Sequence, residues 1–254
     1  MLPTSAYDYL QRYDFGRLQE AIYSQRPADV ERALSRPHRE LTDFLALISP
    51  AAEAYLEPMA REAQRLTLER YGRTLQLYLP LYLSNVCSNS CVYCGFSVEH
   101  HIRRRRLTLA EIDREVAAIK ELGFRHLLLV SGEDLRTSSW RYYLEVVKHL
   151  RPHFAQLSLE VQPLETEQYA ALGEAGISYV CVYQETYHEA AYPKYHLQGK
   201  KADYRYRLET PDRIAQAGIP KIGLGALLGL EEWRTDSAFT ALHLDYLKHR
   251  YRQT

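Results

Sequence analysis

The chain has 254 residues, which fits one large domain or two small ones. Hydrophobic residues make up 46% of it, enough for a sizeable core, so intrinsic disorder is excluded. Lysine plus arginine equals aspartate plus glutamate at 32 each. The overall charge therefore gives no support for a general affinity for nucleic acid or for a membrane surface.

The first residues, MLPTSAYDYLQRYDF, include acidic side chains and lack an apolar core, which argues against a signal peptide. No segment approaches the ~20 apolar residues of a membrane-spanning helix. Without an export signal, a tight group of cysteines is expected to be reduced and to serve metal binding or catalysis. These features favour a cytoplasmic protein.

The predicted elements fall into two regions. Residues 1–72 carry apolar residues at helical spacing, as in ADVERAL and LTDFLALISP, and are predicted to form a helical N-terminal extension. Residues 73–254 alternate between strands and helices. The predicted strands are 75–85, 126–132, 157–164, 179–186 and 222–229, and the helices that follow lie in LTLAEIDREVAAIKELG, WRYYLEVVKHL, ETEQYAALGEAG, YRLETPDRIAQAG and TALHLDYLKHRY.

Five such units indicate a parallel sheet, either a doubly wound open sheet or part of a barrel. A closed (β/α)₈ barrel needs roughly 250 residues, and only 182 residues follow position 72. The predicted fold class is therefore α/β, with a partial (β/α) TIM-type barrel of about five parallel strands over residues 73–254.

Three of the four cysteines lie in CSNSCVYC, just after the first predicted strand. Cys87, Cys91 and Cys94 have the spacing C-x₃-C-x₂-C, at the strand end where α/β proteins gather their ligand sites. Zinc would require a fourth ligand, for which His100 or His101 is available. An iron–sulfur cluster usually takes four cysteines, so three would leave one iron free to bind something else.

The fourth cysteine, Cys181, lies inside a predicted strand and is better explained as a small buried apolar residue than as a ligand. The run from Arg103 to Arg106 is interpreted as a solvated turn before a helix capped by Thr108 and Glu111. Docking of an acidic electron donor at this run is the alternative.

The cysteine loop, with the aromatic Tyr93 before its last cysteine, resembles the signature of the radical S-adenosylmethionine (SAM) superfamily. In that family three cysteines hold a 4Fe–4S cluster, and SAM chelates the fourth iron through its amino and carboxylate groups. Cleavage of SAM then yields methionine and a 5′-deoxyadenosyl radical. The resemblance implies that Cys87, Cys91 and Cys94 are the metal ligands, and that the cofactors are a 4Fe–4S cluster and SAM.

The resemblance extends over nearly the whole chain. LYLSNVCSNSCVYCGFS, HLLLVSGED, EVQPL, YQETYHEA and RLETPDRIAQAGIPKIGLGALLGL are similar to the tyrosine lyases of thiamine biosynthesis, the 2-iminoacetate synthases. This implies cleavage of the Cα–Cβ bond of L-tyrosine to p-cresol and 2-iminoacetate (dehydroglycine), which thiazole synthase consumes. It also implies a flavodoxin-type electron donor.

Two alternatives stay open: a radical SAM lyase for a different aromatic amino acid, and a non-catalytic zinc-binding domain. Because chains of the similar family continue past this point, we expect this one to lack a C-terminal part from the sixth strand onward.

The resemblance also implies roles for individual residues. Gly132 and Glu133, at the end of the second strand, match the element that receives the SAM amino group, and Glu160 is expected to meet the SAM ribose or amino group. Arg213 matches an arginine near the SAM carboxylate, and Gly225 lies in a glycine-rich strand that passes close to adenine.

The end of the fourth strand is expected to line the site near nucleoside and substrate. Thr186 is assigned there to the cofactor, and Gln184, Tyr187 and His188 are candidate catalytic residues without an assigned general base. Arg205 and Arg207 are candidates for the tyrosine carboxylate.

Overall fold

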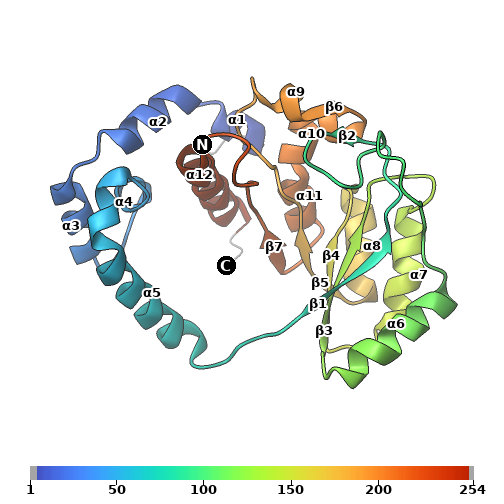
Figure 1. The fold of residues 1–254 in the computed structure, drawn as a ribbon. Helices are drawn as coiled ribbons and strands as arrows, with labels where there is room; N and C mark the ends of the chain where they lie inside the picture. Colours follow the sequence, from blue (N-terminus) through green and yellow to red (C-terminus); the bar gives the residue numbers. More distant parts are fainter. Residues whose placement is uncertain (1–4, 252–254) are drawn as a thin grey trace.

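The computed structural model describes residues 5–251 and is built around one curved, fully parallel sheet. Its strand order is β1-β3-β4-β5-β7. The strands are β1 (Leu79–Ser84), β3 (His126–Ser131), β4 (Gln156–Glu160), β5 (Ile177–Cys181) and β7 (Lys221–Gly223). Helices connect successive strands, so the predicted partial barrel of five parallel strands is confirmed (Figure 1).

Alternation along the strands separates a packed face from a lumen face. In β4, Leu157 and Leu159 belong to the main core, whereas Ser158 and Glu160 line cavities on the opposite face. This is the period of two that a pleated strand imposes. The covering helices are α6 (Leu109–Glu121), α7 (Trp140–Leu150), α8 (Thr166–Ala175) and α11 (Thr210–Gln216). The predicted Thr108–Glu111 capping box begins α6.

Several predicted elements differ in extent. The strands predicted for 157–164, 179–186 and 222–229 end already at Glu160, Cys181 and Gly223. The strand predicted for 75–85 begins only at Leu79, because β3 offers pairing partners from that residue onward, and Leu75 and Leu77 are exposed. The helix predicted for YRLETPDRIAQAG is split into α10 (Tyr204–Leu208) and α11. Pro211 explains the break, since proline lacks the N–H of a helix interior and is placed in the first turn of α11.

The N-terminal helices pack against the last helix of the chain. They are α1 (Ala6–Leu10), α2 (Phe15–Tyr23), α3 (Pro27–Ser35), α4 (Leu41–Leu47) and α5 (Leu56–Tyr71), with a 3₁₀ turn η1 (Pro50–Tyr55). Figure 1 shows them as an arc on the side away from α6 and α7. Leu18 and Ile22 of α2 share a second core with Phe239 and Leu242 of α12 (Trp233–Tyr251). The predicted helical region is thus joined to the C-terminal helix by a common core.

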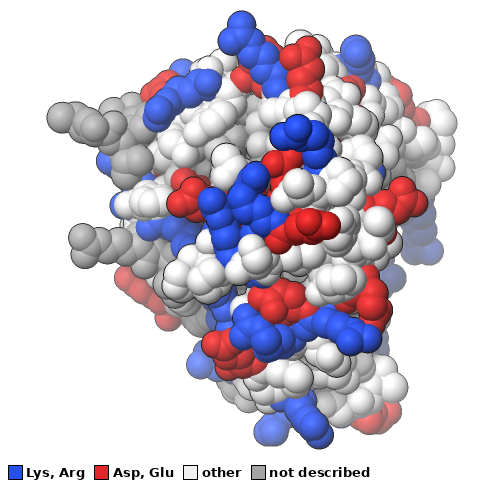
Figure 2. Space-filling model, turned by 90° about the vertical axis from the view of Figure 1, so that its left-hand side faces the viewer, with Lys and Arg blue, Asp and Glu red and all other residues white. Residues whose placement is uncertain are grey.

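Charged side chains of both signs alternate on the face seen in Figure 2, where no large area carries one sign. Short ion pairs also run along α5, such as Arg61–Glu57 at 2.8 Å and Arg65–Glu69 at 2.7 Å. Such exposed pairs add little stability. In the part of the chain that the structure describes, no helix has both the length and the apolar character needed to cross a membrane.

Candidate active site

The three clustered cysteines line one cavity at the carboxyl end of the parallel strands. Cys87, Cys91 and Cys94 lie in the loop after β1, and the cavity has a volume of about 270 Å³. The ends of β3, β4 and β5 supply its other walls, among them Gly132, Glu133 and Glu160. All three thiols are free. The structure therefore brings the cysteine loop together with residues predicted for the cofactor.

Arg104 connects the backbone on both sides of the three cysteines. Its guanidinium donates to the backbone carbonyl oxygens of Asn85 at 2.8 Å, Phe96 at 2.9 Å and Ser97 at 2.6 Å. The interpretation of residues 103–106 as a solvated turn is therefore wrong for Arg104, although Arg103, Arg105 and Arg106 are exposed. A planar guanidinium carries five N–H donors, so it can bind several backbone carbonyl oxygens at once.

The same loop also pairs with a distant segment in a small antiparallel ribbon. The sequence analysis did not predict this ribbon. Strand β2 (Ser90–Cys91) pairs with β6 (His196–Gln198), which follows the short helix α9 (Tyr192–Tyr195). Beyond β6, the backbone N–H of Lys201 donates to Asn89 Oδ1 at 3.1 Å. The ribbon brings residues 196–201 against the cavity wall, although a hundred residues separate them from the cysteines.

Gly132 is placed by close packing at the end of β3. Its N–H donates to the carbonyl oxygen of Ser84 at 2.8 Å. A Cβ on this residue would collide with the backbone carbonyl of Val86, one residue before Cys87. Only glycine lets the β3 loop approach the cysteine loop this closely. The residue was predicted at the cofactor site, and its geometry gives it a role in shaping the loop.

Glu133 is largely enclosed, with its side chain 14% exposed, and it is hydrogen-bonded within the protein. Its Oε1 accepts from Arg207 at 2.8 Å, and its Oε2 accepts from Asn89 at 2.9 Å. Burial raises the pKa of this carboxyl, but the Arg207 guanidinium and the Lys201 ammonium outweigh it and hold the pKa below its usual range. Arg207, predicted for the tyrosine carboxylate, is thus committed here to Glu133 and to the carbonyl of Tyr183 at 2.7 Å.

Lys201 and Glu185 complete a group of charges that the sequence analysis missed. The Lys201 Nζ lies 2.7 Å from Glu185 Oε1, and both residues line the cavity. Glu185 has a backbone φ of 72°, in the left-handed region that non-glycine residues seldom adopt. Strain of this kind concentrates at functional sites. No motif in the stretch HLQGKK signals that Lys201 reaches this cavity.

Glu160 is the cavity carboxylate without a protein partner. Within residues 5–251 it makes no hydrogen bond or ion pair, and it is half-buried at the end of β4. Burial, together with the nearby Glu185 charge, raises its pKa. Three carboxylates and two cations line the cavity, so one negative charge is left over for a cationic ligand.

The residues fit the implied cofactors in their chemistry. Burial raises the pKa of the Cys91 thiol to about 11, so metal binding would have to displace its proton. Among the described residues, no three His, Cys, Asp or Glu side chains are gathered around a single metal position. A four-iron cluster does not need this, because each cysteine binds a different iron. Three thiols and an unpaired carboxylate around one cavity suit a cluster with SAM on its free iron.

The residues predicted at the end of the fourth strand lie beyond β5, and two of them, Thr186 and Tyr187, contact α12. The Asp236 carboxylate accepts from Tyr187 N at 2.7 Å and from Thr186 Oγ1 at 3.1 Å. Tyr187 Oη lies 3.1 Å from His243 Nδ1. Neither Asp236 nor His243 was singled out from the sequence, and both are buried. Thr186 and Tyr187 do not line the cysteine cavity in this structure.

Other predicted residues also have protein partners outside the cavity. His188 Nδ1 lies 2.9 Å from Glu231, and the buried Gln184 donates to the carbonyl oxygen of Tyr204 at 3.4 Å. Arg213 donates to the carbonyl oxygens of Leu164 at 3.0 Å and Tyr206 at 2.7 Å, and exposed Arg205 pairs with Glu209 at 2.9 Å. Gly225 lies against the Tyr183 ring, with a would-be Cβ 3.0 Å from that ring.

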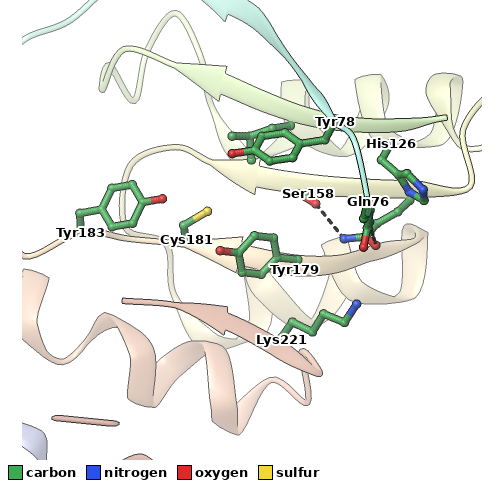
Figure 3. A pocket seen from close by; sticks show the side chains of 10 residues that line it. Gln76, Tyr78, His126, Ser158, Tyr179, Cys181, Tyr183 and Lys221 are labelled. Atoms are coloured by element: carbon green, nitrogen blue, oxygen red, sulfur yellow. Dashed lines mark hydrogen bonds between the residues drawn. The ribbon is translucent and has the colours of Figure 1, made fainter. Parts of the chain in front are cut away.

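A second cavity opens lower on the lumen face of the sheet (Figure 3). Cys181 points into it between Tyr179 and Tyr183, with Lys221 and Ser158 nearby. Both Cys181 and Tyr183 also line the cysteine cavity, so the two spaces adjoin. Cys181 is 2% exposed, in agreement with its interpretation as a buried residue of the strand.

The comparisons with known proteins agree with this architecture. The model of the radical SAM superfamily matches residues 81–239. The chain is 50% identical over 248 residues to the 2-iminoacetate synthase of Escherichia coli K12, covering 97% of this chain and 66% of that protein. A crystal structure of HydG, a maturase of the [FeFe]-hydrogenase, superposes with a TM-score of 0.90 at 28% identity, over 96% of this chain and 56% of HydG.

A crystal structure of methylornithine synthase (PylB) shares the fold, with a TM-score of 0.70 at 21% identity over 84% of this chain and 62% of that protein. A parallel sheet carrying a C-x₃-C-x₂-C loop at its carboxyl end defines a radical SAM core. The chain belongs to the radical SAM superfamily. It is similar to 2-iminoacetate synthases and spans about two thirds of their length.

Proposed function

We propose that the protein is a radical SAM lyase that cleaves the Cα–Cβ bond of L-tyrosine to 2-iminoacetate and p-cresol, for the thiazole of thiamine. The observation that carries the proposal is the half identity to 2-iminoacetate synthase over 97% of the chain, together with three free cysteines around one cavity. Thiazole synthase as consumer of the product and a flavodoxin-type electron donor are part of the proposal.

Cys87, Cys91 and Cys94 would hold the cluster, and Glu160 would receive the cationic or ribose part of SAM. When bound, these groups supply a 5′-deoxyadenosyl radical that removes a hydrogen from the tyrosine amine. The protein's contribution is placement and exclusion of water. Tyr93 and Val182 contribute wall surface to the cavity, and the paired Glu133 and Arg207 add fixed charges that need no reorganisation.

The proposal is tested by anaerobic reconstitution with iron and sulfide, reduction, and addition of SAM with L-tyrosine. We expect 5′-deoxyadenosine and p-cresol by mass spectrometry. Deoxyadenosine without p-cresol, or with a matching product from L-tryptophan instead, would overturn tyrosine as the substrate. Bound zinc without iron–sulfur absorbance would overturn the radical SAM activity.

A matched pair of variants links the result to the cysteine loop. Cys94→Ser should lose the iron and both products. Cys181→Ser changes the same type of residue in a position that also lines the cavity but lies outside the loop, and it should keep the iron. Equal loss of iron in both variants would contradict the assignment of the ligands.

A further inference from the structure

His196 makes two hydrogen bonds that fix the ring of Tyr93. Its Nδ1 lies 3.1 Å from the carbonyl oxygen of Tyr192, and its Nε2 lies 2.8 Å from Tyr93 Oη. The imidazole is buried and stacks on the Tyr192 ring, with 3.8 Å between ring centroids. It meets the Tyr93 ring edge-on, with centroids 5.6 Å apart. The side chain is therefore held on three sides.

These contacts determine which nitrogen carries the proton. A backbone carbonyl only accepts, so Nδ1 must donate to Tyr192. In the neutral ring Nε2 is then an acceptor, and the Tyr93 hydroxyl must donate to it. The orientation of Tyr93 is thus set by a residue 103 positions away in the sequence.

Tyr93 itself is a wall of the cysteine cavity. It lines the cavity between Cys91 and Cys94, and the Lys201 ammonium lies 5.6 Å from the centre of its ring. Backbone pairing adds to this, since His196 pairs with Cys91 in the β2–β6 ribbon and Val92 N donates to Tyr195 O at 3.1 Å. Tyr93 is therefore connected to the segment around His196 through both its side chain and the neighbouring backbone.

We propose that His196 is a positioning residue for the cofactor: by accepting the Tyr93 hydrogen bond it fixes the Tyr93 ring as a rigid wall against bound SAM. The inference rests on the proposed function only in that SAM binds this cavity. It requires neither tyrosine as substrate nor turnover. Fixing a wall before binding lowers the ordering cost of the complex.

The test is a double-mutant cycle on SAM affinity in the reconstituted protein. His196→Phe keeps a ring to stack on Tyr192 and removes the acceptor, and Tyr93→Phe removes the donor. Each should weaken SAM binding by about tenfold, the scale of one lost hydrogen bond in a buried site. The double variant should be no weaker than His196→Phe alone, because His196→Phe already removes the hydrogen bond that Tyr93→Phe removes. His196→Gln, which retains an acceptor, should recover part of the affinity.

Two further readouts separate positioning from general damage. Iron content should stay unchanged in His196→Phe, while the change that SAM causes in the EPR spectrum of the reduced cluster should shrink. Tyr246→Phe is the matched control, since it removes another buried tyrosine bond, to Asp212 at 2.9 Å, outside the cavity. It should bind SAM as the unmodified protein does.

Several outcomes would overturn the inference. They are additive losses in the double variant, loss of iron in His196→Phe, or unchanged SAM affinity in that variant. A reconstituted, unmodified protein that binds no SAM would overturn it together with the proposed function. An unmodified protein that binds SAM without cleaving tyrosine would refute the proposed substrate alone, and the cycle would still decide the role of His196.

Discussion

Arg207 and Arg205 lie two residues apart on α10 and have opposite environments. Arg207 is 5% exposed and pairs at 2.8 Å with Glu133, whose side chain is 14% exposed, whereas Arg205 is exposed and pairs with Glu209 at 2.9 Å. Removing one partner of a buried pair leaves an uncompensated charge in a poorly hydrated site. An exposed pair loses little when one partner goes, because water solvates the other.

Arg207→Met should therefore lower the free energy of unfolding by about 3–5 kcal/mol, and Arg205→Met should lower it far less, because water screens the exposed pair. Urea unfolding of the cofactor-free protein at pH 7, followed by circular dichroism, measures both changes. Similar small losses in the two variants would show that water reaches Glu133 and that the pair is not buried in solution.

The sequence predicted the residues whose types carry their own signal. Three cysteines at fixed spacing, and a glutamate interrupting the apolar run of β4, can be found without a structure, and the structure places both at one cavity. Lys201 and His196 could not be found this way. They follow β5 in a stretch without a motif, and their place at the cavity depends on the β2–β6 pairing.

Gly132 links the element β3 to the cysteine loop. A Cβ there would meet the carbonyl of Val86, which is backbone and cannot rotate away. Gly132→Ala should therefore destabilise the cofactor-free protein by about 1–3 kcal/mol, the usual cost of overpacking. The midpoint of urea unfolding measures this. Gly95 follows Cys94 in the cysteine loop, and no atom lies within 4 Å of a Cβ added there. Gly95→Ala should therefore change the midpoint of unfolding little. Equal effects would show that the loop moves aside freely.

At the scale of elements, periodicity predicted the order of strands and helices, and the boundaries depended on partners. The stretch before Leu79 has strand-like alternation but no neighbouring strand to pair with. Regular pairing of β7 with β5 ends at Gly223, and the segments beyond the two strands stay in contact through an isolated bridge, Glu185 with Ala226, and through bonds such as Gln184 N to Gly225 O at 3.1 Å. Tertiary pairing thus overrides local preference at both ends of the sheet.

At the scale of the whole molecule, the two regions drawn from the sequence, 1–72 and 73–254, share a core. At the predicted boundary α5 ends at Tyr71, and Gly72 has a positive φ of 61°. Yet α1 and α2 bury their apolar faces against α12. No pattern within residues 1–72 could reveal this, because an amphipathic helix does not specify which surface covers it.

The shared core makes a prediction about cooperativity. Phe239 of α12 stacks between Phe15 of α2 and Tyr187, at centroid distances of 5.6 and 6.0 Å, and is 5% exposed. Phe239→Ala should lower the free energy of unfolding by about 3–5 kcal/mol, through lost burial and the cavity left behind. Leu244→Ala on the same helix, at a side chain 51% exposed, should cost far less.

Because both regions contribute to this core, the loss in Phe239→Ala should appear as a shift of one transition. Circular dichroism, which follows the helices, and tryptophan fluorescence, which follows Trp140 beside the main core and Trp233 at the start of α12, should give the same midpoint. If the helical region folded independently, Phe239→Ala would instead split the curve into two transitions. The transition of the parallel sheet would then keep the midpoint of the unmodified protein.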